Sequence, residues 1–420
     1  MNHLETEQDR KDRWYAKHIA PEYVEVRSAT LDEMTKSSGI IDKPGGSEES
    51  LPAVPGVPSS LLQRSEARQY LRTHLQQYGF AVVRHVMKDS ECNHALSLAW
   101  DYLEAASAAE KKFQEHGGTC KVGQNKNDGA LWPKDPVRRN EVKTYKSEFY
   151  PRSVEGNIFA FYGSGHSSFM WYLRSREMVQ ETFAAIHNVN TDDLMTSMDG
   201  FVLWTESDRQ KDRGWFHIDQ SPTMKPEFCS IQGLVNLLPV TEKTGGNVVV
   251  VGSHSMFPEH YLQRNNLLFY EDRLKEIGTD DWLEIDPNDG MLETKRVISC
   301  LLAPGDLLIW DSRTVHCSYR EDFEESSASV FDSQFGLIRA AGLVNMIPRV
   351  DCSKEFEMER KEAISNSRTL THWATKVSPL GNERDDDVQK EGRCVRYLKQ
   401  QRRNILLSFD DLTDSQRNLV

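Results

Sequence analysis

Apolar and polar positions in the first half of the chain repeat at helical spacing. In the segment SEARQYLRTHLQQYGF, the side chains of Tyr70, Leu71 and Leu75 fall on one side of a helix. A glycine ends this helix, and FAVVRHVM follows as a short strand. Residues 90–118, which end in two glycines, and residues 170–189 each predict one further helix.

The pattern changes near residue 195, where short apolar runs begin to alternate with turns rich in Gly, Pro, Asn and Asp. Several β-rich runs at such close spacing predict a sandwich or a barrel. The runs cover residues 198–204, 230–240, 247–253, 298–310 and 335–348.

These shifts divide the chain into three parts that we expect to pack as one unit. A polar N-terminal extension and linker covers residues 1–62, the main domain covers 63–350, and a helical C-terminal extension and tail covers 351–420. The main domain consists of a helical part, 63–194, and a β-rich core, 195–350. Residues 257–295 form an insertion within that core.

The flanking segments have distinct compositions. Residues 1–35 are polar and mildly helical in pattern, and residues 36–60 are rich in Pro, Gly and Ser, as a linker is. The insertion looks partly helical, as a flap would. Beyond a helix at 352–367, the acidic stretch 382–387 predicts a loop, and the chain ends in a polar tail.

Charge and cysteine usage narrow the possible partners and compartments. The 51 basic and 64 acidic residues give a formal net charge of −13, which argues against a nucleic-acid or anionic-membrane binder. The seven cysteines are scattered and form no CxxC pair, as expected in a reducing compartment. No secretory signal and no run of 18 apolar residues is visible, so we expect a cytoplasmic protein without a membrane partner. The oligomeric state stays open.

The residues with the clearest chemistry are His217, Asp219 and His316. In an extended segment, residues i and i+2 point to the same face, so the imidazole of His217 and the carboxylate of Asp219 project together. His316 follows the apolar run LLIWD far downstream. Two histidines and one carboxylate on one face of a metal suit Fe(II) and leave positions open for a co-substrate and O₂.

Each of these three residues also has a simpler interpretation. An HxD pair arises by chance in many proteins, and the chain has 13 histidines. His316 alone fits a core or turn histidine. A closed zinc site would favour cysteine ligands. The nearby Cys317 alternates with His316 and should point away from it.

The order of four short motifs resembles one family. The motifs are Trp215–Gln220, Thr244–Asn247 with the VVVVGSH run that ends at His254, Ala303–Asp306 and Val315–Ser318. In this order they resemble the phytanoyl-CoA dioxygenase-like group of Fe(II)/2-oxoglutarate-dependent oxygenases, over about residues 65–375. The resemblance implies an α+β fold. Its core would be a double-stranded β-helix (a jelly roll, cupin-like) with flanking N- and C-terminal helices.

The resemblance also implies a role for individual residues. His217, Asp219 and His316 map onto the metal triad. The family's arginine that binds the distal carboxylate of 2-oxoglutarate would fall at position 327 or 328, which are Ser327 and Ala328 here.

The acidic, Ser-rich stretch 321–334 looks like a loop insertion, and the next strand carries Arg339 near its start. Arg339 is therefore our choice for the co-substrate arginine. Arg320 and Arg349 are the alternatives, together with a solvated ion pair.

Other positions near the expected pocket have weaker assignments. Ser318 occupies a place where the family often has a small hydroxyl residue, so it is a candidate for co-substrate binding or simply a turn serine. His254 is more consistent with a structural role than with a ligand. Four other residues flank the expected pocket, and a role in the core or in strand pairing fits them equally well: Gln220, Gln232, Asn236 and Trp310. The basic cluster 134–146 is more consistent with a solvated surface.

The resulting functional prediction is a dioxygenase that uses Fe(II), 2-oxoglutarate and O₂. The 63–350 domain would oxidise, most simply hydroxylate, an unactivated C–H of a small molecule, with release of succinate and CO₂. Asp219 argues against halogenation, because related halogenases have a small residue at that position. Alternatives are an oxygenase of protein or nucleic acid and a non-catalytic jelly-roll protein. The segments 120–170 and 257–295 are expected to contact substrate.

Overall fold

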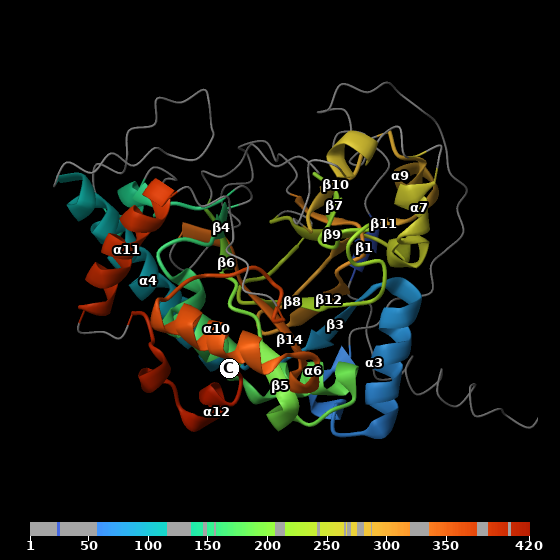
Figure 1. Cartoon of the computed structure of the whole chain (residues 1–420), viewed down its shortest axis with the longest axis horizontal. Coiled ribbons are helices and arrows are strands. Elements are labelled where there is room, and N and C mark those ends of the chain that lie inside the picture. The colour runs from blue at the N-terminus through green and yellow to red at the C-terminus, as the bar shows by residue number, and fades with distance from the viewer. Residues whose placement is uncertain are drawn as a thin grey trace, which may run out of the picture.

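Two β-sheets form the centre of the structure, a computed structural model (Figure 1). The strands of the larger sheet run in the order β2-β3-β12-β8-β14-β6-β4, with β5 paired to the far end of β14. All its pairs are antiparallel except β2 with β3. Its strands are β2 Val57–Pro58, β3 Phe80–Arg84, β4 Ile158–Phe159, β5 Leu194–Thr196, β6 Phe201–Thr205, β8 Ile231–Asn236, β12 Leu307–Asp311 and β14 Leu337–Pro348.

The smaller sheet has the order β1-β11-β9-β13-β7-β10, and every pair in it is antiparallel. Its strands are β1 Tyr23–Glu25, β7 His217–Ile218, β9 Gly246–Val250, β10 Leu283–Glu284, β11 Val297–Cys300 and β13 His316–Tyr319. The structure describes residues 23–25, 57–115, 136–145, 149–154, 157–205, 215–241, 244–263, 266, 270–274, 281–286, 288–319, 336–375, 385–401 and 405–420.

The side chains of β12 show how the two sheets pack. Leu307 and Ile309 belong to the core beneath the helices, whereas Leu308 and Trp310 belong to a second core shared with Val249 of the smaller sheet. This alternation is the expected result of a strand with period two that is buried on both faces. The sheets therefore face each other, and the predicted jelly roll with flanking helices is confirmed.

Helices cover the outer face of the larger sheet, and two short helices lie beside the smaller one (Figure 1). α4 and α11 lie side by side, so the N-terminal and C-terminal helical parts share one core. The α-helices are α3 Ser65–Tyr78, α4 Asp89–Glu115, α5 Ser168–Arg174, α6 Glu177–His187, α7 Glu259–Leu262, α9 Gly290–Thr294, α10 Lys354–Ser365, α11 Asp385–Lys399 and α12 Asp414–Arg417. The 3-10 helices are η1 Ser59–Leu61, η2 Val142–Thr144, η5 Ser164–His166, η6 Thr191–Asp193, η8 Ser253–Met256, η11 Arg349–Asp351 and η12 Phe409–Asp411.

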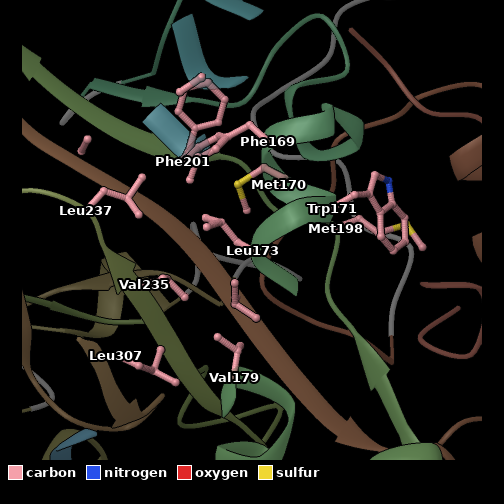
Figure 2. Close-up of a cluster of buried hydrophobic side chains, with 14 of the residues drawn as sticks. Phe169, Met170, Trp171, Leu173, Val179, Met198, Phe201, Val235, Leu237 and Leu307 are labelled. Carbon is pink, nitrogen blue, oxygen red and sulfur yellow. The ribbon is translucent and has the colours of Figure 1, made fainter. Parts of the chain in front are cut away.

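Helix α5 packs closely on the larger sheet (Figure 2). Its side chains Phe169, Met170 and Leu173 point toward the strands that carry Val235 and other buried apolar residues. Gly342 of β14 makes this approach possible, since a Cβ atom there would lie 2.2 Å from Leu173 Cδ1. A side chain at this position would overlap the helix.

The single helix predicted over 170–189 was wrong, because the chain breaks between α5 and α6. Arg176 has extended backbone angles, with φ −70° and ψ 128°. Trp171 and Arg174 of α5 are buried, as are the apolar residues that face the sheet. The helix is therefore buried on more than one side, and no stripe of polar residues in the sequence shows where it ends. The guanidinium of Arg174 donates to the carbonyl oxygens of Gly165 and Asp199 at the point where the helix ends.

Three expectations for the flanking segments also need correction. Tyr23–Glu25, within the stretch read as mildly helical, is a strand paired with β11. Asp385–Asp387, predicted to lie in a loop, begin α11. The expected polar tail ends in the buried residues Leu419 and Val420. Among the described helices, none is both long and apolar enough to cross a bilayer.

Candidate metal centre

Two neighbouring strands of the smaller sheet bring the distant histidines together. His217 of β7 and His316 of β13 are direct partners in the ladder, and their ring centroids lie 4.3 Å apart. Asp219 follows β7 by one residue, and its backbone N–H donates to the carbonyl oxygen of Ser312 at 3.0 Å. Ser312 lies in the turn between β12 and β13, so that turn fixes Asp219 beside His316.

The three side chains converge on one point. His217 Nε2 lies 3.7 Å from Asp219 Oδ1, and His316 Nε2 lies 3.4 Å from Asp219 Oδ2. One ligand atom from each residue lies within 4.8 Å of the other two. Within the described part of the chain, this is the one cluster of at least three His, Cys, Asp or Glu residues with such spacing.

The backbone sets the orientation of both imidazole rings. His217 Nδ1–H donates to the carbonyl oxygen of Trp215 at 3.0 Å, and His316 Nδ1–H donates to that of Thr314 at 2.9 Å. In each case the acceptor lies two residues earlier in the chain. The remaining nitrogen, Nε2, then carries a lone pair toward Asp219, the arrangement typical of metal-ligating histidines.

Burial and neighbouring side chains shift the pKa values of His217 and Asp219 toward the protonation states that bind a cation. Burial, reinforced by His316, lowers the pKa of His217 to about 4, so its ring is neutral at pH 7. Burial alone would raise the pKa of Asp219. The two neighbouring imidazoles outweigh burial and hold the pKa of Asp219 well below its usual range. Neutral imidazoles and an ionised carboxylate are the forms that coordinate a metal.

Further side chains support the centre. Gln232 of β8 donates its Nε2–H to Asp219 Oδ2 at 2.8 Å. The indole of Trp215 stacks on His217 with centroids 4.3 Å apart and an angle of 8°, and Trp310 lies 5.2 Å from the ring of His316. These contacts restrict the motion of all three metal-facing groups.

Arg339 occupies the space between the sheets close to the histidines. Its side chain is 1% exposed and lies over the ring of Trp204, with 4.3 Å from Cζ to the centroid. Nη1 donates to Ser318 Oγ at 3.0 Å and Nη2 donates to Asn247 Oδ1. Ser318 and Asn247 are themselves partners across β13 and β9.

The charge of Arg339 has no acidic partner among the described residues. Its Nε is buried without a hydrogen-bond acceptor there, and burial lowers its pKa from 12.5 to about 9. A buried cation of this kind is costly unless an anion joins it. A guanidinium in this setting is suited to bind a carboxylate.

The other candidates take structural positions. His254 Nε2 lies 3.0 Å from the carbonyl oxygen of Gln76 near the end of α3, away from the triad. Asn236 donates to the carbonyl oxygens of Leu238 and Ala303, and so holds the turn that contains the APGD motif.

Gln220 holds the loop after the triad carboxylate through the carbonyl oxygens of Lys225 and Glu227. Arg349 pairs with Glu357 on the outer surface, and Cys317 is buried in the core beneath the smaller sheet. Arg320 and positions 327 and 328 lie outside the described residues. Of the basic cluster 134–146, residues 136–145 are described, and Arg139 there forms ion pairs with Asp101 and Glu104 of α4.

Two contributors near the centre had no distinctive signal in the sequence. Asn247 was quoted only as part of a Gly-Gly-Asn turn, but its side chain holds the guanidinium of Arg339. His372 lies in the C-terminal segment, far from every motif, yet it is among the groups that affect the pKa values of Asp219 and His217. Their positions depend on tertiary contacts that a single sequence does not reveal.

Comparison with known proteins places the chain in a family. The model of the phytanoyl-CoA dioxygenase (PhyH) family matches residues 75–321, more than half of the chain. A curated relative, Ava biosynthesis cluster protein O of Aspergillus versicolor, is 33% identical over 258 residues, which are 56% of this chain and 74% of the relative.

Two solved structures share the fold. A candidate oxidoreductase from Salmonella typhimurium LT2 is 16% identical, covers 98% of this chain and 92% of its own, and superposes with a TM-score of 0.51. A hypothetical protein from Escherichia coli is 14% identical with the same coverages and a TM-score of 0.50.

The metal-facing residues and the family together indicate which cofactor the chain uses. Two imidazoles, one carboxylate and a buried arginine that has no acidic partner among the described residues fit Fe(II) and 2-oxoglutarate, the predicted cofactor and co-substrate. The chain belongs to the phytanoyl-CoA dioxygenase family and is an Fe(II)- and 2-oxoglutarate-dependent oxygenase.

Proposed function

We propose that this oxygenase hydroxylates an unactivated C–H of a small molecule, with release of succinate and CO₂. His217, Asp219 and His316 would hold the metal, and Arg339 with Ser318 would hold the distal carboxylate of 2-oxoglutarate. The observation that carries the proposal is the convergence of Nε2, carboxylate and Nε2 beside a buried arginine for which the described part of the chain offers no acidic partner. A bound Fe(II) would supply the oxidation chemistry, which couples decarboxylation of the co-substrate to attack on the C–H.

The protein's own contribution is binding and orientation. The peptide carbonyls behind both histidines fix their tautomers, and Gln232 fixes the carboxylate of Asp219. Arg339 orients the co-substrate through its planar fork, and Trp204 beneath it restricts the guanidinium to one plane. Positioning of this kind is the protein's main role in cofactor-dependent oxidation.

Two observations favour a small-molecule substrate. The relative from Aspergillus versicolor is named as a biosynthesis cluster protein, and such clusters make small molecules. The net charge of −13 disfavours a nucleic-acid substrate. The carboxylate of Asp219 next to His217 keeps the halide position of related halogenases closed, which leaves hydroxylation, desaturation or ring closure.

The test is succinate formation by the purified protein with Fe(II), 2-oxoglutarate and O₂, first alone and then with a panel of small molecules. We expect a slow substrate-free rate that selected compounds stimulate. The variant His217→Ala should lose it, whereas His94→Ala, an exposed position on α4, should keep it. Undiminished turnover in His217→Ala would contradict the proposed metal ligands. Stimulation by peptides or oligonucleotides, but by no small molecule, would contradict the substrate class.

A further inference from the structure

The segment that follows α10 lies beyond the part of the chain matched by the family model, yet it reaches the metal centre. Asn345 of β14 donates its Nδ2–H to the carbonyl oxygen of His372 at 2.6 Å. Asn345 is the ladder partner of Gln232, which in turn donates to Asp219. A chain of direct contacts therefore ties the backbone at His372 to the residues around the metal-facing carboxylate.

A second set of contacts fixes the neighbouring residue over the loop that follows the triad carboxylate. Trp373 packs under Lys225, whose Nζ lies 3.5 Å from the centre of the indole ring. Lys225 also forms an ion pair with Asp281, the residue before Trp282. Three separate segments thus meet at this side of the metal centre: the loop after Asp219, the insertion and the C-terminal segment.

The imidazole of His372 is placed for a contact beyond the metal ligands. Its ring packs against Trp373, with centroids 4.7 Å apart. Its Nε2 is buried and has no hydrogen-bond partner among the described residues. Asp219 and His316 are among the groups that affect the pKa of His372, but the ring is outside the set of three converging ligand atoms. A buried imidazole nitrogen without a partner near the centre is suited to bond to a polar group of a ligand.

The same side of the centre carries exposed aromatic surface. Trp282 is 43% exposed, so part of its indole ring is accessible to a ligand. Its ring lies 6.0 Å from that of His217 and 6.1 Å from that of Trp215. An indole that is accessible to solvent and adjacent to a metal-facing histidine provides a flat apolar wall for a ligand.

We infer that the substrate is a flat, largely apolar ring system that carries one hydrogen-bonding group, and that His372 Nε2 bonds to that group. Trp282 would contact the ring face, and Trp373 would hold His372 in place. His372 is then a substrate-binding residue supplied by the C-terminal segment. This inference rests on the proposed function, because it assigns the substrate class of the same site.

The test compares 1-naphthol with naphthalene, two probes that differ by one hydroxyl group. Binding is measured by ligand-observed NMR titration of the full chain loaded with Fe(II) and 2-oxoglutarate without oxygen. Since no turnover is needed, failure here is distinguishable from failure of succinate formation. We expect wild type to bind 1-naphthol about 3- to 10-fold more tightly than naphthalene, the effect of one net hydrogen bond.

Variants assign this preference to one residue. His372→Phe should bring the ratio of the two affinities close to one, because it keeps a ring against Trp373 but removes the nitrogen. His372→Gln, which retains a hydrogen-bonding group, should restore part of the ratio and serves if the Phe variant does not fold. The matched control His94→Phe should leave it unchanged. An unchanged ratio in both His372 variants, equal affinities in wild type, or no binding of either probe would overturn the inference.

Discussion

Replacing Arg339 with Met tests co-substrate binding separately from metal binding. The side chain is buried, and its guanidinium touches Ser318, Asn247 and Trp204 but no acidic group among the described residues. Methionine fills a similar volume and removes the charge together with all its N–H donors. Because none of the three metal-facing residues contacts Arg339 in the described contacts, the metal affinity should be retained.

The size of the effect follows from the bonds that a carboxylate would form. A hydrogen bond to a charged group contributes about 1.5–3 kcal/mol, so a bidentate pair contributes about 3–6 kcal/mol. At about 1.4 kcal/mol for each factor of ten, Arg339→Met should weaken 2-oxoglutarate binding by about 10²- to 10⁴-fold. The expected change in metal affinity is less than about threefold.

The stability of the variant should move in the opposite direction from its affinity. Burial lowers the pKa of Arg339 from 12.5 to about 9, which means that the folded state holds this charge at a cost near neutral pH. Without 2-oxoglutarate, Arg339→Met should therefore unfold at the same temperature as wild type or a higher one. Added 2-oxoglutarate should raise the unfolding temperature of metal-loaded wild type but not that of the variant.

The assay is anaerobic titration of the Fe(II) protein with 2-oxoglutarate, followed by the visible absorption of the chelate, with metal affinity measured separately by competition. Arg349→Met is the matched control, because Arg349 pairs with Glu357 on the outer surface. If Arg339→Met bound 2-oxoglutarate within threefold of wild type, the assignment of this arginine would be refuted. If Arg349→Met showed the loss instead, the alternative arginine would be correct.

Three further changes test the support of the site and the fold. Gln232→Leu removes the donor to Asp219 and should weaken Fe(II) binding about 10- to 100-fold in a metal competition assay, while an unchanged affinity would show that this hydrogen bond does not matter. Burial raises the pKa of Glu110 from 4.5 to about 7, so the folded state binds its proton more tightly and stability falls as pH rises through that range. Glu110→Gln should remove this fall, which amounts to about 3 kcal/mol between pH 4 and pH 8 in urea unfolding, and parallel pH curves would exclude it. Gly342→Val places a side chain against Leu173 of α5 and should lower the free energy of unfolding by about 1–3 kcal/mol, whereas an unchanged midpoint would mean that the helix moves freely.

The fold and the metal-facing residues were accessible from the sequence because their signals are local. His217 and Asp219 are two positions apart, so strand alternation alone places them on one side. The order of short motifs supplied His316. Arg339 was found on the strand beyond the acidic stretch 321–334, and strand β14 does bring its side chain to Ser318.

Other features depend on contacts between segments that are distant in the chain. The break between α5 and α6 was missed because buried side chains surround α5 and no polar stripe marks its end. The role of Gln232 was left open, since a glutamine in a strand fits a ladder position as well as a carboxylate contact. His372 carries no motif at all, and its place near the metal centre is set by Asn345 and by the packing of Trp373 on Lys225.

The hydrogen bonds from the two histidines to carbonyl oxygens just before their own strands have an evolutionary consequence. Each imidazole takes its orientation from a peptide group two residues earlier, and a peptide group is present whatever the side chain there. Substitutions in the loops, the insertion and the C-terminal segment can therefore accumulate without changing how these rings present Nε2. New substrate preferences can be selected in the surrounding segments while the metal-facing histidines stay constant, so specificity and oxidation chemistry are separately evolvable.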